Sequence, residues 1–429
     1  MKSPVLVEES VPRTSAAPSV PERQPASFVL SLVAAQGLVS LALFTPVVVS
    51  LSLRVSQIAP HDKTSALSTV LAVGALLALI GNPLFGALSD RTSSRFGRRR
   101  PWLVGGMVVG TVGLLVAGAA GNVAVLTLGW AITQLGLNAT LAALSATVPD
   151  RVPEQQRGRV SGAVGMMTYV AMVVGSFLAQ ALTSHPVLLF GVPGVFGLVG
   201  VALLARALRG ERPADRASLP PFRIGAFVRS FWVSPRTHPD FAWNFVGRFL
   251  IFAGMATVTS YEFYFVQDRL GKNDSAAAGT LGVATLLMTV GAVIGSLGIG
   301  AYSDRIGRRK PFVFLGASIA VVGLALIAAA HSTSAFYLAM ALFGLGLGAY
   351  LAVDTALTVG VLPNPTDAAK DLGVLNIANA LPQSLIPVIA PVFLAIGSAA
   401  HTDYTALYAF GAVAALLGAT AIRFVRSVA

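Results

Sequence analysis

The stretch that decides the fold is residues 86–102, GALSDRTSSRFGRRRPW, which lies between two long apolar runs. A shorter version, GAYSDRIGRRKPF, occupies residues 300–312 and again separates two apolar runs. The aspartates of the two copies, Asp90 and Asp304, are separated by about half of the 429 residues. A motif that recurs at this distance indicates an internal repeat, so we expect two halves with the same architecture.

The composition on both sides of the motif indicates a membrane protein. The chain is 55% hydrophobic and only 11% charged, whereas soluble domains carry about 25% charged residues. An open sheet cannot satisfy its backbone in lipid, so the apolar segments are expected to be helices. We predict an all-α membrane protein whose twelve transmembrane helices form two six-helix bundles related by the repeat. The expected spans are roughly residues 27–53, 65–89, 102–120, 122–147, 159–182, 187–208, 240–266, 276–301, 312–330, 334–361, 371–397 and 404–424.

These segments divide the chain into four parts. Residues 1–26 are rich in proline and predict a disordered cytoplasmic tail. Residues 27–208 form the first bundle, residues 209–239 a cytoplasmic linker, and residues 240–429 the second bundle. Within the linker, residues 222–232 carry aromatics at helical spacing with Arg between them. This pattern predicts either a short helix on the inner leaflet or a linker that merely tolerates aromatics.

The positions of the basic residues predict orientation. With the tail inside, 25 of the 30 Lys and Arg fall in inner segments and four in outer ones, which places both termini in the cytoplasm. The net charge of +12 does not indicate a nucleic-acid partner, because the basic residues lie in short loops between spans. We therefore expect a monomer that is integral to the cytoplasmic membrane, with the lipid bilayer as its partner.

The chain offers no residues for enzyme chemistry. It contains no cysteine, which excludes disulfides and thiolate metal sites. No metal-ligand spacing, nucleophile elbow or phosphate-cradling loop is present, so we expect no enzyme activity and no metal or other cofactor.

The repeated motif resembles the signature loop of the major facilitator superfamily. Its longer form, SDRTSSRFGRRRP at residues 89–101, is similar to the loop of the glycoside–pentoside–hexuronide:cation symporters, and above all to that of the sucrose:proton symporter branch. The resemblance implies transport by alternating access, with the first, fourth, seventh and tenth spans lining a central cavity. Asn82 stands where melibiose-type members carry an acid, and their acid in span four and lysine in span eleven are also missing, which disfavours a sodium site of that kind.

The resemblance also implies a gate. In the superfamily, the loop aspartate after span two approaches the start of span eleven, so Asp90 is expected near Gly373 and Asp304 near Gly158. A carboxylate at a helix start would accept its free N–H groups and meet the positive end of its dipole. The expected gating residues are Gly86, Asp90, Arg91, Gly97 and Arg98, with their counterparts Gly300, Asp304, Arg305, Gly307 and Arg308.

Charged residues inside the spans are costly and indicate function. Away from the span ends, only Asp354, Glu262 and Arg248 fall within the expected spans. Arg248 and Asp354 lie at nearly one depth, roughly 12 and 10 Å above the inner boundary. We predict that they pair and couple a proton to transport; a static structural bridge is the alternative. Glu262 is either a proton entry point or ligand contact, or a carboxylate that reaches the outer interface.

Neutral amides on three spans indicate a polar cavity. Each of them either contacts a solute, for which sugar hydroxyls are well suited, or joins helices. They are Gln134 and Asn138 on span four, Asn244 on span seven, and Asn376, Asn379 and Gln383 on span eleven.

Small residues and prolines predict how the spans pack. Gly158 with Gly162, and Gly291 with Gly295, have the spacing that lets two helix backbones approach closely. Prolines in spans one, two and eleven predict either broken helices, which line the sites of transporters, or kinks that serve packing alone, and for Pro46 we favour the packing kink. They are Pro46, Pro83, Pro382, Pro387 and Pro391.

These features favour one function among three. The leading prediction is uptake of a small solute, a sugar or glycoside, together with H⁺. The alternatives are proton-coupled export of amphipathic compounds and a substrate-free sensor built on a transporter body.

Overall fold

The computed structural model describes residues 23–210, 225, 233–361, 368–396 and 404–425. Twelve of the helices in this part are long and apolar enough to cross a membrane, which confirms the predicted fold class. In the first half they are α1 (Ala26–Thr45) continued by the π-helix η1 (Pro46–Ser50) and α2 (Leu51–Ile58), then α3 (Lys63–Asp90), α4 (Arg100–Gly118), α5 (Val123–Arg151), α6 (Glu154–Leu182) and α7 (Pro186–Ala207). In the second half they are α9 (Pro239–Asp268), α10 (Asp274–Gly295) continued by η3 (Ser296–Gly300) and α11 (Ala301–Ile306), then α12 (Lys310–Ala329), α13 (Thr333–Gly360), α14 (Ala368–Leu394), and α15 (Tyr404–Ala421) continued by η5 (Ile422–Phe424).

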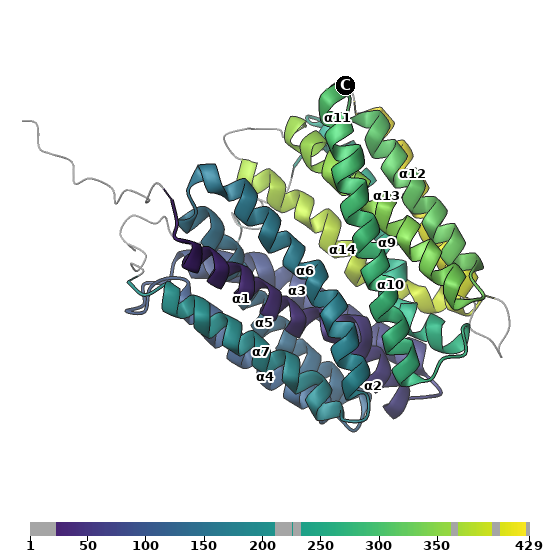
Figure 1. The fold of residues 1–429 in the computed structure, drawn as a ribbon, viewed down its shortest axis with the longest axis horizontal. Helices are drawn as coiled ribbons and strands as arrows, with labels where there is room; N and C mark the ends of the chain where they lie inside the picture. The colour runs from purple at the N-terminus through teal and green to yellow at the C-terminus, as the bar shows by residue number, and fades with distance from the viewer. Residues whose placement is uncertain (1–22, 211–224, 226–232, 362–367, 397–403, 426–429) are drawn as a thin grey trace, which may run out of the picture.

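The two halves form separate bundles that lie side by side (Figure 1). In the first half, α1 packs against α6 and α7, and α4 packs against α5. In the second half, α9 packs against α15, and α13 packs against α10 and α12. Across the boundary, α3 lies against α14 and α6 against α10. Segments that are far apart in the sequence therefore face one another between the bundles.

The repeated motif folds in a related way in both halves. Gly97 follows α3 and has φ of 93°, and Gly307 follows α11 and has φ of 71°. These backbone conformations are readily adopted only by glycine. A few residues later, Pro101 and Pro311 occupy the first turns of α4 and α12, where proline has no intrahelical N–H bond to lose. The glycines and prolines of the motif therefore set where each helix pair turns.

Glycines bring α10 and α13 into backbone contact. A Cβ added to Gly291 would collide with the carbonyl oxygen of Ala341, and one added to Gly295 with that of Leu345. The close approach predicted for these two glycines is therefore confirmed. The same prediction was wrong for Gly158 and Gly162, because an added Cβ on either meets nothing within 4 Å.

The prolines bend the chain less than the sequence suggested. Pro46 begins a π-helical turn, a common adjustment where a helix loses one N–H. Pro83 lies inside the continuous helix α3, and Pro382, Pro387 and Pro391 lie inside the continuous helix α14. The prediction of broken helices was therefore wrong for these two spans. Each proline nevertheless leaves the carbonyl four residues earlier without its intrahelical partner.

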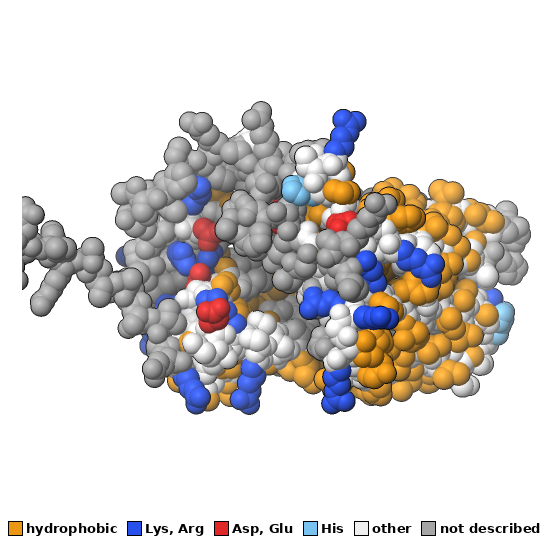
Figure 2. Space-filling view, turned by 90° about the horizontal axis from the view of Figure 1, so that it is seen from above, with side chains coloured by type: hydrophobic (Ala, Val, Ile, Leu, Met, Phe, Trp, Pro, Cys, Tyr) orange, Lys and Arg blue, Asp and Glu red, His pale blue; other side chains and the backbone are white. Residues whose placement is uncertain are grey.

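The surface fits a protein surrounded by lipid. Figure 2 shows hydrophobic side chains over the flank of one half, with Lys, Arg, Asp and Glu side chains toward the other side of the view. Exposed apolar residues such as Val322 and Leu417, on α12 and α15, are 51% and 55% exposed. The short helix predicted within residues 222–232 lies outside the described residues, apart from Gly225.

Candidate transport site

A cavity of about 220 Å³ lies between the two bundles. Its wall combines helices from both halves, and no charged side chain is among its lining residues. Aromatic and aliphatic groups make up most of this wall, and amides and hydroxyls the rest. The lining residues are Leu43, Phe44 and Val47 of α1 and η1, Leu71, Ala75 and Ala78 of α3, Trp130, Gln134 and Asn138 of α5, Thr259 and Ser260 of α9, and Ala380, Gln383 and Pro387 of α14.

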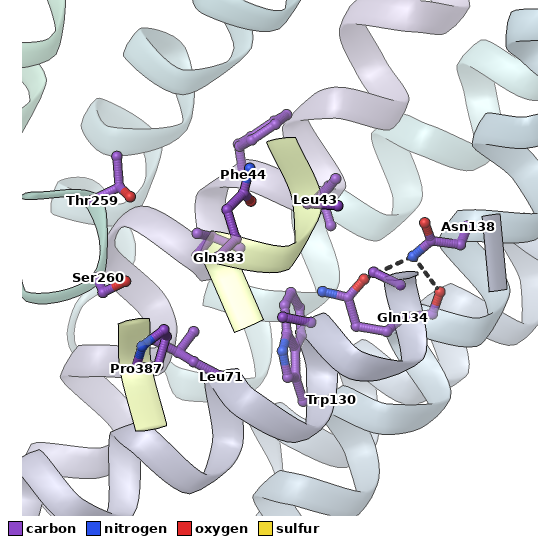
Figure 3. Close-up of a pocket in the computed structure, with 14 residues that line it drawn as sticks. Leu43, Phe44, Leu71, Trp130, Gln134, Asn138, Thr259, Ser260, Gln383 and Pro387 are labelled. Atoms are coloured by element: carbon purple, nitrogen blue, oxygen red, sulfur yellow. Dashed lines mark hydrogen bonds between the residues drawn. The ribbon is translucent and has the colours of Figure 1, made fainter. Parts of the chain in front are cut away.

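One face of α5 supplies the polar groups of the first half. Trp130, Gln134 and Asn138 are four residues apart, so they lie one above another along the helix (Figure 3). The Asn138 amide nitrogen donates to the backbone oxygen of Gln134 at 2.8 Å and to its side-chain Oε1 at 2.9 Å. The Trp130 indole N–H is buried without a hydrogen-bond partner among the described residues. This face therefore presents the amides of Gln134 and Asn138 to the cavity.

Gly74 of α3 makes room for the Trp130 ring. A Cβ at Gly74 would collide with the indole nitrogen. Because glycine has no side chain, the ring can lie flat against α3 and form one wall of the cavity. Sequence reasoning did not identify Trp130, since an aromatic residue in an apolar span is ordinarily part of the packing.

Three of the six predicted solute contacts line this cavity, namely Gln134, Asn138 and Gln383. The other three do not. Asn244 is fully buried and donates to Thr358 Oγ1 at 3.1 Å, so it joins α9 to α13. Asn379 accepts from Arg248, and Asn376 lies one turn further along α14, outside the cavity wall. For Asn244, therefore, the structure favours the helix-joining alternative.

Arg248 and Asp354 form the ion pair that the sequence predicted. Nη1 of Arg248 lies 2.8 Å from Oδ2 of Asp354, whose side chain is only 1% exposed. The guanidinium also donates from Nε to Asn379 Oδ1 at 2.6 Å and from Nη1 to Thr358 Oγ1 at 3.4 Å. One arginine of α9 thus joins α13 and α14 close to the cavity. The positive charge of Arg248 offsets part of the cost of burying a charged Asp354 in the membrane.

Glu262 lies elsewhere. Its residue is 3% exposed, and its neighbours Tyr261, Phe263 and Tyr264 are also buried. It does not line the cavity between the halves. The expectation that it reaches the outer interface was therefore wrong, because the helix packs this face into the second bundle. Glu262 is therefore not placed to contact a solute in this cavity.

Hydrogen bonds close the cavity at one end by joining the two halves. We call this set the latch: Ser52 of α2, Lys63 and Ser68 of α3, Tyr264 and Asp268 of α9, and Pro387 of α14, whose carbonyl also accepts from Tyr261 of its own half. Lys63 pairs with Asp268 at 2.5 Å. The Tyr264 hydroxyl donates to the Ser52 carbonyl at 2.9 Å. Ser68 and Tyr261 both donate to the carbonyl of Pro387.

The latch acceptor follows from the sequence of α14. In an α-helix the carbonyl of residue 387 would accept the N–H of residue 391, but residue 391 is a proline and has no N–H. The freed carbonyl of Pro387 is therefore available to Ser68 of the other half. In the same way Pro387 frees the carbonyl of Gln383, which belongs to the cavity wall.

Pro391→Ala is expected to weaken the latch. The new N–H would compete with Ser68 and Tyr261 for the Pro387 carbonyl, and one net hydrogen bond is worth about 0.5–1.5 kcal/mol, so the open fraction should rise roughly two- to tenfold. Because the chain has no cysteine, His61→Cys and Ser275→Cys can carry two spin labels at this end, one on each half. Pulsed spin-resonance distances in lipid nanodiscs then report the opening.

The matched control is Pro382→Ala on the same helix. Its new N–H would restore a bond to the carbonyl of Ala378, a residue that is fully buried and not part of the latch. The distance distribution should stay that of the unaltered chain. Equal opening in Pro382→Ala and Pro391→Ala would show that the freed carbonyl is not what holds the latch.

At the opposite end, the motif builds an ion-pair cluster around Arg99. This buried arginine pairs with Asp90 at 2.5 Å and with Asp150 at 2.9 Å, and it also donates to Ser89. Arg98 pairs with Asp150 at 2.7 Å. The ends of α3 and α5 are thereby held to the start of α4. Sequence reasoning named Asp90 and Arg98 but missed Arg99 and Asp150, although Arg99 lies within the repeated motif itself.

The sequence predicted contacts between the halves at this end, with Asp90 near Gly373 and Asp304 near Gly158. The cluster around Arg99 described above does not include them. Asp90 is paired with Arg99 of its own half rather than with the region near Gly373. The side chain of Asp304 lies outside the described residues. An added Cβ on Gly86 meets nothing within 4 Å, and Arg305 and Arg308 are exposed. A gating role for these residues stays a prediction.

Known proteins share this architecture. Among solved structures, the chain superimposes on a point mutant of the nucleoside transporter NupG with a TM-score of 0.73, covering 92% of this chain and 99% of that one. The sequence identity is 12%, so this likeness shows the fold alone.

Sequence relatives include transporters of several kinds. An uncharacterised MFS-type transporter of Mycobacterium tuberculosis is 26% identical over 69% of this chain, which spans about half of that relative's length (49%). Two shorter matches are a general alpha-glucoside permease of Schizosaccharomyces pombe, 26% identical over 26% of this chain and 23% of the permease, and the multidrug resistance protein MdtL of Klebsiella pneumoniae, 32% identical over 29% and 30%.

The family is shown by a match to nearly the whole chain. The model of the Major Facilitator Superfamily matches residues 27–297 and again residues 271–428, so the two matches together span residues 27–428. Twelve membrane-spanning helices and a closed cavity between two bundles agree with that match. The chain is an integral membrane protein and belongs to the Major Facilitator Superfamily.

Proposed function

We propose that this protein moves a small uncharged solute, a sugar or glycoside, across the cytoplasmic membrane by proton-coupled alternating access. The observation that carries the proposal is the composition of the cavity wall. Amide groups of Gln134, Asn138 and Gln383 face a space that no charged side chain lines. Neutral donors and acceptors bind hydroxyl groups without the cost of burying an uncompensated charge.

The size and shape of the cavity support a small ring-shaped solute. Its volume of about 220 Å³ is below the roughly 300–1,000 Å³ of pockets for drug-sized ligands. Trp130 and Phe44 give flat apolar surfaces against which the C–H face of a sugar ring can pack.

The ion pair supports coupling to a proton. Arg248 reaches Asn379, one turn from Gln383 of the cavity wall. A proton on Asp354 removes the attraction that holds Arg248 to α13, and so changes the balance between two conformations. No solute needs to touch Asp354 for this effect.

The latch supports alternating access. The loops before Lys63 and after Asp268 lie on the outer side in the orientation that the basic residues predict. The structure then corresponds to a conformation closed toward the outside, with both termini in the cytoplasm. The reverse conformation would require the latch bonds to break.

A thermal-shift screen of the purified protein tests the solute class. Monosaccharides, disaccharides, glycosides, nucleosides and cationic drugs are the probes, because a ligand at about 100 times its Kd stabilises the folded state by about 2.7 kcal/mol. A sugar or glycoside should raise the Tm of the unaltered protein, and Gln383→Ala should reduce that shift. Stabilisation by cationic drugs alone would contradict the proposal.

The apolar share of the wall favours a second candidate, proton-coupled export of an amphipathic compound. Leu43, Val47 and Leu71 face the same space as the amides. The relative named as a multidrug resistance protein matches part of this chain. The two candidates differ in direction: inside-out vesicles should accumulate the exported compound when their interior is acidic, whereas a symported sugar should enter vesicles together with protons.

A further inference from the structure

Three residues on one face of α14 contact, in chain order, the arginine of the ion pair, the cavity and the latch. Asn379, Gln383 and Pro387 are four residues apart and so lie on one face. Asn379 accepts from Arg248, Gln383 lines the cavity, and the Pro387 carbonyl accepts from Ser68. The Gln383 amide also donates to the Asn379 carbonyl at 3.4 Å.

We propose that Asn379 is a positioning residue that does not contact the solute. Through its bond to Arg248 it makes the position of α14, and with it the strength of the latch, depend on whether Asp354 is protonated. The inference rests on the proton coupling proposed above. It changes the role expected from the sequence, which placed Asn379 among the solute contacts.

The guanidinium of Arg248 contacts two helices other than its own, α13 and α14. Nη1 lies 2.8 Å from Asp354 of α13, and Nε donates to Asn379 of α14 at 2.6 Å. While Asp354 is charged, the guanidinium is drawn to α13 and holds α14 beside it. A proton on Asp354 removes that attraction, and the hold of Arg248 on α13 is reduced to its 3.4 Å contact with Thr358.

The helix can transmit this change over the required distance. Eight residues of α14 separate Asn379 from Pro387, which corresponds to about 12 Å along the axis. Both residues lie within one continuous helix. A shift of the helix at Asn379 therefore displaces the latch acceptor as well, and the latch should loosen when Asp354 is protonated.

The other titratable groups near Asp354 are few. Arg248 of α9 and Tyr350 of its own helix face it. The helices α10 and α12, which pack against α13, each have one titratable residue, Asp274 and Lys310, at their first position. Asp354 is therefore the acid in this part of the described chain whose proton would control the hold on Arg248.

The test measures the latch directly and needs no solute. Spin labels on His61→Cys and Ser275→Cys report the distance between the halves in lipid nanodiscs at acidic and alkaline pH. In the otherwise unaltered protein, the open population should rise at least about threefold in acid. Asp354→Asn should remove the pH dependence, and so should Asn379→Ala, although it retains both partners of the ion pair.

Two further variants separate positioning from a merely structural role. Asn376→Ala removes an amide one turn away whose 3.5 Å contact is with Asn379 itself, and it should keep the full pH dependence. Asn379→Asp has the same shape and gives Arg248 a second carboxylate on α14, so it should hold the latch closed at both pH values even if Asn379→Ala unfolds.

The outcomes are distinguishable. A pH dependence that survives in Asn379→Ala and Asn379→Asp but not in Asp354→Asn overturns the role of Asn379 and leaves proton coupling standing. A pH dependence that survives in Asp354→Asn overturns both. If the open population of the unaltered protein does not change with pH, the inference is overturned. The proposed function is then tested separately by solute accumulation in proteoliposomes.

Discussion

Asp354→Asn is expected to abolish pH-driven accumulation of the solute while exchange of labelled for unlabelled solute continues. Asparagine keeps the shape of the side chain and an oxygen for Arg248, but it cannot take up a proton in the transport cycle. In proteoliposomes with an imposed pH gradient, the ratio of inside to outside solute should fall to about one. The solute is whichever probe stabilises the purified protein.

Glu262→Gln is the matched control, because it neutralises another buried acid among the expected spans. Glu262 does not line the cavity and is not a partner in the latch bonds described above, so accumulation should persist. Accumulation that survives in Asp354→Asn would refute the coupling role. If that variant cannot be purified in a folded form, the ion pair is a structural bridge, since breaking one buried partner costs about 3–5 kcal/mol.

Gly348→Val is expected to remove most of the folded protein. A Cβ on Gly348 would collide with the carbonyl oxygen of Ala292, and one on the neighbouring Gly344 with that of Met288. Overpacking costs about 1–3 kcal/mol when side chains can move, but here the obstacle is the backbone of α10. The two helices would have to separate, and the contacts made by Gly291 and Gly295 would be lost with them.

The yield of monodisperse protein and its thermal unfolding in detergent measure this effect. Gly162→Val on α6 is the control, since an added Cβ there meets nothing within 4 Å. It should give protein that unfolds near the temperature of the unaltered chain. Equal behaviour of Gly348→Val and Gly162→Val would show that the contact between α10 and α13 tolerates extra volume.

The pairing of Arg248 with Asp354 was predictable because charges inside a membrane span are few and costly. Their depths could be counted along each helix, and so few intramembrane charges left little choice of partner. The solute contacts were harder to predict. An amide is equally suited to binding a solute and to joining helices, and only the packing shows that Asn244 meets Thr358 whereas Gln134 meets the cavity.

The sequence by itself determined the number of spans, the repeat and the family, because apolar length and a duplicated loop motif are properties of the chain read in order. It also determined that residue 387 would have a free carbonyl, since residue 391 is a proline. The tertiary structure decided what that carbonyl meets. Ser68 lies 319 residues from Pro387, and no local pattern specifies a contact between bundles formed by different halves of the chain. The latch, the placement of Trp130 against Gly74 and the burial of Glu262 all depend on how the helices pack, because each side chain's partner comes from a different span.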